Sequence, residues 1–256
     1  MARALEEAIR SGQWQVGSKL PGERVLASDY GVSRVVAREV LRSLESEGLI
    51  KIVPARGAFV SRPDGNLLSG AFSRLILTQG ATVRDVAETR TVLEVEIAGR
   101  VAANHSNQAI EVLYANAESV DAGDDRVRQG IADLQFHSLL AFLAGNPVLT
   151  SMHRALAPHI LLMMLRSERK EDSANVPHRA IVDSIRDQDV DQARELARAH
   201  VAVTERHFGA DYERPVEEVA SENLNRMSSG LWNLADVERV AFRELEQILQ
   251  QVERYS

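Results

Sequence analysis

The feature that most limits the possible folds is a turn at residues 31–33 between two short helical patterns. Gly31 stands where the first helix would place a left-handed C′ residue, and Ser33 is a good N-cap for the second. Apolar runs at 49–53 and 58–60 around a Pro/Gly turn indicate a β-hairpin. With one more helical pattern before them, these elements predict a winged helix-turn-helix. The expected apolar faces are Val25, Leu26 and Tyr30 before the turn and Val36, Val40, Leu41 and Leu44 after it.

Side chains suited to DNA contact are placed along this segment where a winged helix meets a duplex. The helix after the turn has about 14 residues and spans roughly 21 Å, which fits a major groove. Its N-terminal end meets base edges and phosphates, and a hairpin tip can enter the minor groove. The residues at these places, with one on the preceding helix, are Arg24, Ser33, Arg34, Arg38, Arg56 and Gly57. Any single arginine is more often merely solvated, but the joint pattern favours DNA binding.

Net charge, counted by segment, agrees with this interpretation. The chain of 256 residues has a formal net charge of −7, which argues against indiscriminate coating of nucleic acid. Residues 1–64 hold ten basic and eight acidic side chains, a net of +2, so the remainder carries −9. An acidic body discourages non-specific binding to DNA and leaves binding to a few placed arginines.

The N-terminal segment resembles the GntR family of bacterial transcription regulators. The stretches that carry the resemblance are LPGERVLA at 20–27, GVSRVVAREVLRSLESEGLI at 31–50 and RGAFV at 56–60. The resemblance covers about residues 4–61 and implies that Ser33 lies close to phosphate. The residues that it implies in operator contact are Arg24, Arg34, Arg38 and Gly57. The run at 35–37, Val-Val-Ala, departs from the pattern of relatives, so no base preference is carried over.

Beyond a break at residues 62–66, the sequence predicts helices over nearly its whole length. Apolar residues from Leu67 to about Phe208 lie at helical spacing, and Gly and Pro gather at breaks between them. This pattern predicts an all-α bundle, and hence a mainly α protein. The expected segments are a winged helix-turn-helix at 1–62, a linker at 63–69, an all-α sensor domain at 70–208 and a helical C-terminal extension at 209–256.

Three histidines and one carboxylate lie at spacings that could form a metal site. Asp133 and His137 are four residues apart on one helical face, His178 opens a second helix, and His200 lies on a third. Such a donor set would suit zinc, nickel or manganese. The chain has no cysteine, so any metal must be held by histidine and carboxylate. A lone histidine is more often a surface or core residue, so spacing alone leaves the site open.

The same segment resembles the effector-binding FCD domain of the FadR-like subfamily of GntR regulators, over about residues 82–208. The matching stretches are DVAETRTVLE at 85–94, DLQFH at 133–137, HRAIVD at 178–183 and RAH at 198–200. The resemblance implies one divalent ion inside the bundle, with zinc the first candidate. The implied ligands are Asp133, His137, His178 and His200. His159 and His207 are the fallback ligands and are assigned to structure.

Four protein ligands leave two positions of an octahedral ion open, which a small organic acid could fill with carboxylate oxygens. An arginine would be a suitable second anchor, because its planar fork matches a carboxylate. Arg90 matches a position that often has this role in the subfamily. Alternatively, Arg90 pairs with Glu88 or Glu94 on its own helix, and the sequence does not choose between the two.

These features predict a cytoplasmic bacterial transcription regulator rather than an enzyme. It should bind double-stranded operator DNA as a homodimer, because one recognition helix reads too few base pairs for specificity. A small carboxylate effector should act by shifting the population of bundle geometries. Repression relieved by ligand is the commoner arrangement in relatives, and the sequence leaves the sign open. No apolar run approaches a membrane span, and the charged N-terminus disfavours a secretory signal.

Two alternative functions remain open. A metal hydrolase or dioxygenase could use the open positions of the ion, but no further acid or base stands at a fixed spacing. A metal-independent acyl-CoA or lipid sensor would keep the histidines in the core. In the tail, the apolar stripe at 231–255 could pack against the bundle or form a dimer contact.

Overall fold

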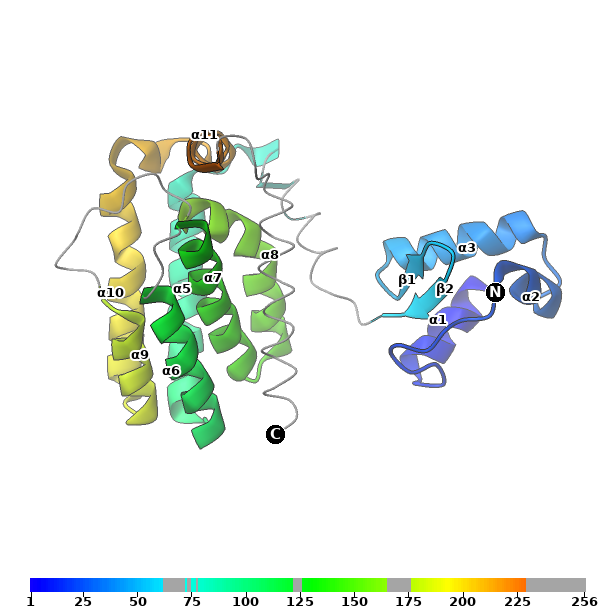
Figure 1. Cartoon of the computed structure of the whole chain (residues 1–256), viewed down its shortest axis with the longest axis horizontal. Helices are drawn as coiled ribbons and strands as arrows, with labels where there is room; N and C mark the ends of the chain where they lie inside the picture. The colour runs from blue at the N-terminus through cyan, green and yellow to red at the C-terminus, as the bar shows by residue number, and fades with distance from the viewer. Residues whose placement is uncertain (62–71, 73–74, 77, 122–125, 165–175, 229–256) are drawn as a thin grey trace. The chain divides into compact units, whose positions relative to one another are not determined.

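The computed structural model describes residues 1–61, 72, 75–76, 78–121, 126–164 and 176–228 (Figure 1). The chain divides into two compact units, Met1–Leu68 and Ser69–Ser256, and each has a hydrophobic core of its own. Helices dominate the described residues, and strands occur there as one antiparallel pair. The predicted fold class is therefore confirmed.

The first unit is the predicted winged helix-turn-helix. Its elements are α1 (Ala2–Arg10), α2 (Glu23–Asp29), α3 (Arg34–Ser46), β1 (Ile50–Val53) and β2 (Gly57–Val60). The two strands pair antiparallel, with Ile50 opposite Val60 and Val53 opposite Gly57. Gly57 has a φ of +108°, and a Cβ built there would lie 3.1 Å from the Lys19 side chain. Both facts favour glycine at the end of the hairpin turn.

The turn before α3 is fixed by a side-chain cap. The hydroxyl oxygen of Ser33 accepts a hydrogen bond from the backbone N–H of Val36 at 3.2 Å, which satisfies one free donor of the first turn. The side chains that α3 turns into the core are those of Ala37, Leu41 and Leu44. The opposite face of α3 is thereby left exposed to solvent.

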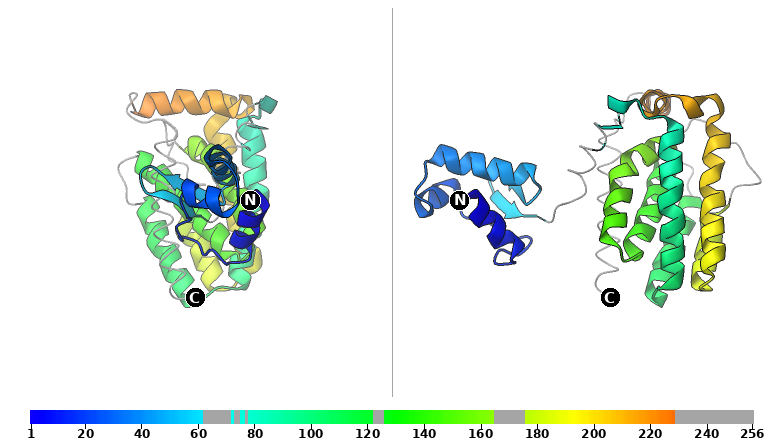
Figure 2. Two further views of the ribbon diagram at one scale, coloured as in Figure 1. Left: turned by 90° about the vertical axis from the view of Figure 1, so that its right-hand side faces the viewer. Right: turned by 180° about the vertical axis from the view of Figure 1, so that it is seen from behind.

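The second unit is the predicted helical bundle. Its long helices are α5 (Val83–Ala103), α6 (Asn107–Asp121), α7 (Arg126–Leu143), α8 (Pro147–Met164), α9 (His178–Arg186) and α10 (Val190–Phe208). A capping box between Thr82 and Asp85 begins α5, which packs against α7, α8, α9 and α10. Figure 2 shows α5 and α10 side by side along their length. Because α5 packs against several other helices, side chains from different parts of the chain meet beside it.

A short 3-10 helix, η1 (Gly209–Glu213), and α11 (Val216–Ser228) follow the bundle helices, and α11 lies across one end of the bundle (Figures 1 and 2). The backbone N–H of Val216 donates to the carbonyl of Ala81 at 2.9 Å, and Val216 and Val219 are buried. The expected linker at 63–69 and the apolar stripe at 231–255 lie outside the described residues. Among the helices described, none is long and apolar enough to cross a membrane.

Candidate metal centre and DNA-binding surface

Four side chains from three helices of the bundle converge on one small region. Asp133 and His137 come from α7, His178 is the first residue of α9, and His200 lies on α10. One possible ligand atom from each lies within 4.8 Å of every other. The side chains of α7 and α9 are buried, and that of His200 is half-buried. The structure thus brings together the four residues that the sequence singled out as ligands.

The nitrogen atoms of the cluster fit a divalent cation. Nε2 of His178 lies 2.8 Å from Oδ1 of Asp133, yet it is a buried nitrogen that makes no aligned hydrogen bond to a described residue. Nδ1 of His200 lies 2.8 Å from the carbonyl oxygen of Val176, so Nδ1 carries the proton and Nε2 the lone pair. Buried lone pairs beside a carboxylate form the mixed nitrogen and oxygen donor set that such ions prefer.

The tautomer of His137 is fixed by Arg90 on α5. Nη2 of Arg90 lies 2.9 Å from Nε2 of His137, and a guanidinium can only donate, so Nε2 is the acceptor nitrogen. The ring proton therefore lies on Nδ1, which is 3.0 Å from Oε2 of Glu94. His137 and His200 thus both carry their lone pair on Nε2.

The pKa values of the cluster favour the ionisation states that metal binding requires. Burial would raise the pKa of Asp133, but the attraction of His178 and His137 holds it well below the usual value. Burial, with the nearby His178 and His137, lowers the pKa of His200 to about 3. Burial also lowers the pKa of His137, against the opposing attraction of Glu94. Near pH 7 the carboxylate is ionised and these two imidazoles are neutral, as metal ligands must be.

Arg90 makes the intrahelical pair that the sequence left as an alternative. Its Nε donates to Oε1 of Glu94 at 2.6 Å, and both side chains are 5% exposed. Burial would raise the pKa of Glu94, but Arg90 and His137 hold it well below its usual range. Nε2 of the buried His153 on α8 lies 3.7 Å from Oε1 of Glu94. Arg90 therefore both pairs with Glu94 and lies against the candidate metal cluster.

Glu94 and His153 were not predicted as site residues. The spacing of four between Arg90 and Glu94 was the available signal for Glu94. His153 had no distinguishing sequence signal, because its role depends on the packing of α8 against α5. Of the fallback ligands, His159 is buried on α8 but is not part of the cluster of possible ligands found among the described residues. The side chain of His207 lies outside the described part of the chain.

A small hollow adjoins the cluster. It holds at most about 230 Å³ of empty space, part of it open to solvent. Its apolar lining comes from α5, α7, α9 and α10, and the polar lining residues are Glu94 and His137. The apolar residues are Ile97, Ala98, Leu140, Ile181 and Ala197. The hollow is thus a small and mostly apolar recess beside His137.

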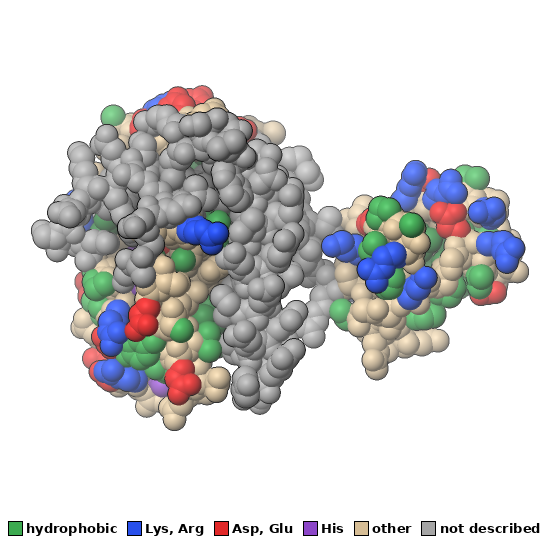
Figure 3. Space-filling view, viewed as in Figure 1, with side chains coloured by type: hydrophobic (Ala, Val, Ile, Leu, Met, Phe, Trp, Pro, Cys, Tyr) green, Lys and Arg blue, Asp and Glu red, His purple; other side chains and the backbone are tan. Residues whose placement is uncertain are grey.

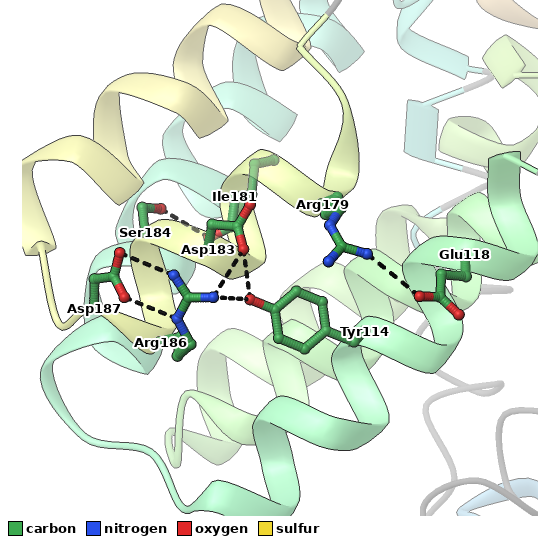
Figure 4. Close-up of polar contacts among 8 residues, drawn as sticks. All are labelled: Tyr114, Glu118, Arg179, Ile181, Asp183, Ser184, Arg186 and Asp187. Carbon is green, nitrogen blue, oxygen red and sulfur yellow. Dashed lines mark hydrogen bonds and ion pairs between the residues drawn. The ribbon is translucent and has the colours of Figure 1, made fainter.

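A polar network fixes α9, the helix that begins at His178, to α6 (Figure 4). The Tyr114 hydroxyl donates to Oδ1 of Asp183 at 2.5 Å and accepts from Nη1 of Arg186 at 2.9 Å. Arg179 lies over the Tyr114 ring, with 5.2 Å from its guanidinium carbon to the ring centroid. The network holds both ends of α9 against α6 and so limits where His178 can lie.

The expected DNA-contacting residues are all exposed on the first unit. Figure 3 shows Lys and Arg side chains over this unit with hydrophobic side chains between them. Nε and Nη2 of Arg38 each donate to a carboxylate oxygen of Glu23 at 2.9 Å, which ties α3 to α2 and leaves Arg38 half exposed. Arg56 lies over the Phe59 ring at 5.7 Å. Arg38 and Arg56 are therefore held in place before any DNA is bound.

Family models match both parts of the chain. The model of bacterial regulatory proteins of the gntR family matches residues 1–60, and the FCD domain model matches residues 85–203. The HTH-type transcriptional repressor NanR of Klebsiella aerogenes is 30% identical over 209 residues, which cover 77% of this chain and 79% of the relative. The chain belongs to the GntR family, in its FadR-like subfamily. The resemblance found in the sequence is thereby confirmed.

Further similarities support this GntR-family assignment. NanR of Escherichia coli strain K12 is 29% identical over 220 residues, which cover 80% of this chain and 82% of the relative. The solved structure of Streptococcus agalactiae GntR has a TM-score of 0.62 and 25% identity, and the match covers 80% of this chain and 97% of that chain. This GntR-family protein is therefore a DNA-binding transcription regulator rather than an enzyme.

The family matches coincide with the two groups of candidate residues in this GntR regulator. All residues expected at the DNA fall within the gntR match at 1–60. The possible metal ligands and Arg90 fall within the FCD match at 85–203. DNA contact and metal binding are thus expected in separate units of the chain.

Proposed function

We propose that this GntR regulator is a repressor whose bundle binds one divalent metal ion together with a small organic acid. The observation that carries the proposal is the cluster of one carboxylate and three imidazoles whose possible ligand atoms all lie within 4.8 Å of one another. Zinc is the first candidate for this donor set, with nickel and manganese as alternatives. When bound, the ion supplies positive charge and open coordination positions. The proposed ligands are Asp133, His137, His178 and His200.

The hollow beside His137 favours a small effector over an acyl-CoA, because its empty space is at most about 230 Å³ and part of that is open to solvent. Arg90 lies against His137, and its guanidinium carries the positive charge that a carboxylate requires. We therefore assign the effector a carboxylate group, with Arg90 as its protein anchor.

Operator binding is assigned to the first unit, as a homodimer acting on duplex DNA in the cytoplasm. Repression is supported by the names of the relatives, which are transcriptional repressors. The acid would favour one bundle geometry, and the linker at 63–69 would carry the change to the paired recognition helices. The residues assigned to DNA are Arg24, Ser33, Arg34, Arg38, Arg56 and Gly57.

The metal proposal is tested by titrating metal-free protein with Zn²⁺ in a calorimeter and measuring bound metal by mass spectrometry. We expect one ion per chain for the wild type and none for the double variant His137→Ala/His178→Ala. The matched control is His159→Ala, another buried histidine of the bundle, which should keep its ion. Circular dichroism checks the fold of each variant. Wild-type protein that takes up no Zn²⁺, Ni²⁺ or Mn²⁺ would contradict the proposal.

The effector proposal is tested by a thermal-shift screen of small carboxylates with and without added Zn²⁺. A stabilising acid should act only on the metal-loaded protein and should weaken retardation of a duplex selected from a random pool. Stabilisation by acyl-CoA without metal would favour the lipid-sensing alternative instead.

A further inference from the structure

The helix proposed to read the operator exposes an apolar side chain on a face that is otherwise mostly polar. Val35, the second residue of α3, is 67% exposed, more than any other large apolar residue described in the first unit. On its other side, α3 buries Ala37, Leu41 and Leu44. Apart from Val36, the other exposed residues of the helix are polar or charged, namely Arg34, Arg38, Glu39, Arg42, Ser43 and Ser46.

Neither packing nor helix stability accounts for this valine. Its side chain takes no part in the hydrophobic core of the first unit. β-branched residues are also weaker helix formers than the straight-chain polar residues suited to a solvent face. What Val35 offers is a rigid pair of methyl groups, because a valine in a helix keeps one preferred rotamer. A ligand that meets these methyl groups would cost little side-chain entropy.

The surroundings of Val35 point to a base edge of DNA as that ligand. Arg38 lies one helical turn after Val35 and Arg42 two turns after it, on the same face of α3. Arg38 is held by Glu23 through two hydrogen bonds of 2.9 Å and stays half exposed. Positive charges attract the phosphates that border a groove, and the first residues of a recognition helix meet the base edges. Val35 is therefore expected to face the bases in the major groove.

We propose that Val35 reads a thymine in each half-site of the operator, with its methyl groups packed against the C5-methyl of that base. The inference rests on the proposed contact of α3 with the operator. In the major groove the thymine methyl is the apolar group on the base edges, and the other groups are hydrogen-bond donors and acceptors. Valine can pair with none of these, so a different base pair opposite Val35 would leave polar groups without a partner. The methyl contact thus gives the discrimination.

The test uses full-length protein and a duplex that the wild type selects from a random pool. Each thymine is replaced in turn by deoxyuridine, in both half-sites together, which removes the C5-methyl and keeps every base-pairing group. Fluorescence anisotropy should reveal a position where this replacement weakens binding at least about tenfold, because one buried methyl group is worth about fourfold and two are lost. At that position, 5-methylcytosine paired with guanine should bind more tightly than cytosine paired with guanine, because it restores the methyl group.

Val35→Ala removes both γ methyl groups and tests whether this residue makes the contact. The deoxyuridine penalty at the sensitive position should fall to about twofold or less in this variant. Because alanine is the better helix former and Val35 lies outside the core, the variant should keep its fold, which circular dichroism checks. The matched control is Val92→Ala, which alters a valine of the second unit that is 72% exposed and should leave the wild-type penalty unchanged.

The outcomes separate this inference from the function on which it rests. A selected half-site without a thymine, or binding that no deoxyuridine replacement weakens, would show that the role of Val35 is wrong while operator binding stands. An equal deoxyuridine penalty in wild type and Val35→Ala would lead to the same conclusion. If the wild type enriches no duplex from the pool, or if Arg34→Ala/Arg38→Ala keeps full operator affinity, the proposed contact of α3 fails as well.

Discussion

At the residue scale, the bundle interior is unusual because it holds charged groups where apolar side chains would pack. Arg90 and Glu94 form a pair that is 5% exposed on each side, and Asp133 is buried nearby. A buried ion pair often contributes no more stability than apolar residues of the same size, because both charges lose their water. Its presence beside three imidazoles is better explained by binding than by stability.

The buried imidazoles should make the metal-free protein sensitive to acid. The pKa of His200 is about 3 in the folded protein and 6.5 when unperturbed. Between these values the unfolded chain binds more protons, so the free energy of unfolding falls as the pH is lowered from about 6.5 toward 3. The slope is at most about 1.4 kcal/mol per pH unit for this group, and His137 acts in the same direction. Urea unfolding between pH 7 and 5 measures it, and His200→Gln should flatten the dependence.

An equal pH dependence in wild type and His200→Gln would contradict this account. Zn²⁺ provides a second check, because a metal ion holds the imidazoles unprotonated. The midpoint of urea unfolding at pH 5.5 should therefore recover more with saturating Zn²⁺ in the wild type than in His200→Gln.

Single residues also show what could not be predicted from the sequence. Spacing predicted the helix after the turn but not its inner face, because the run at 35–37 is apolar throughout. The structure buries Ala37 and leaves Val36 45% exposed, and Val25 and Tyr30, also expected inside, are 46% and 38% exposed. The apolar face of so short a helix is set by its neighbours rather than by its own pattern. Glu94 was not predicted for the same reason, since its contact with His137 exists only once α5 and α7 are packed together.

At the scale of elements, α9 is the part of the site that most needs outside support. It has nine residues, a length at which an isolated helix is marginal. It is held by the Tyr114 network on one side (Figure 4) and by buried Ile181 and Ile185 on the other. The sequence predicted that a helix begins at His178, but not that Tyr114, 69 residues before Asp183, would bind it. Contacts between distant helices leave no local pattern in the chain.

Tyr114→Phe should therefore weaken both the fold and the metal site. The variant loses the hydroxyl that donates to Asp183 and accepts from Arg186. We expect about 0.5–1.5 kcal/mol less stability in urea unfolding and a several-fold weaker Zn²⁺ affinity by calorimetry. Tyr30→Phe is the matched control, because this tyrosine is exposed on the other unit, and neither quantity should change. Unchanged Zn²⁺ affinity in Tyr114→Phe would show that the network does not position His178.

At the scale of the whole molecule, each proposed binding function is assigned to a unit with its own core, so the two should be separable by substitution. The double variant Arg34→Ala/Arg38→Ala removes two exposed side chains of α3, one of them bonded to Glu23, and both belong to the first unit. With two arginines fewer at the phosphates, DNA binding releases fewer counterions. The affinity for a duplex selected by the wild type should therefore fall to a non-specific level, and its salt dependence should become shallower.

The same double variant should bind Zn²⁺ with wild-type stoichiometry and affinity, because the ligands of the bundle pack within a separate core. Conversely, His137→Ala/His178→Ala should lose Zn²⁺ while its first unit keeps the exposed arginines that we propose contact DNA. Fluorescence anisotropy with labelled duplex and calorimetry with Zn²⁺ on the same preparations measure both properties. Retention of operator affinity by Arg34→Ala/Arg38→Ala would remove α3 as the reading helix, whereas loss of Zn²⁺ binding in that variant would mean that the two units do not fold independently.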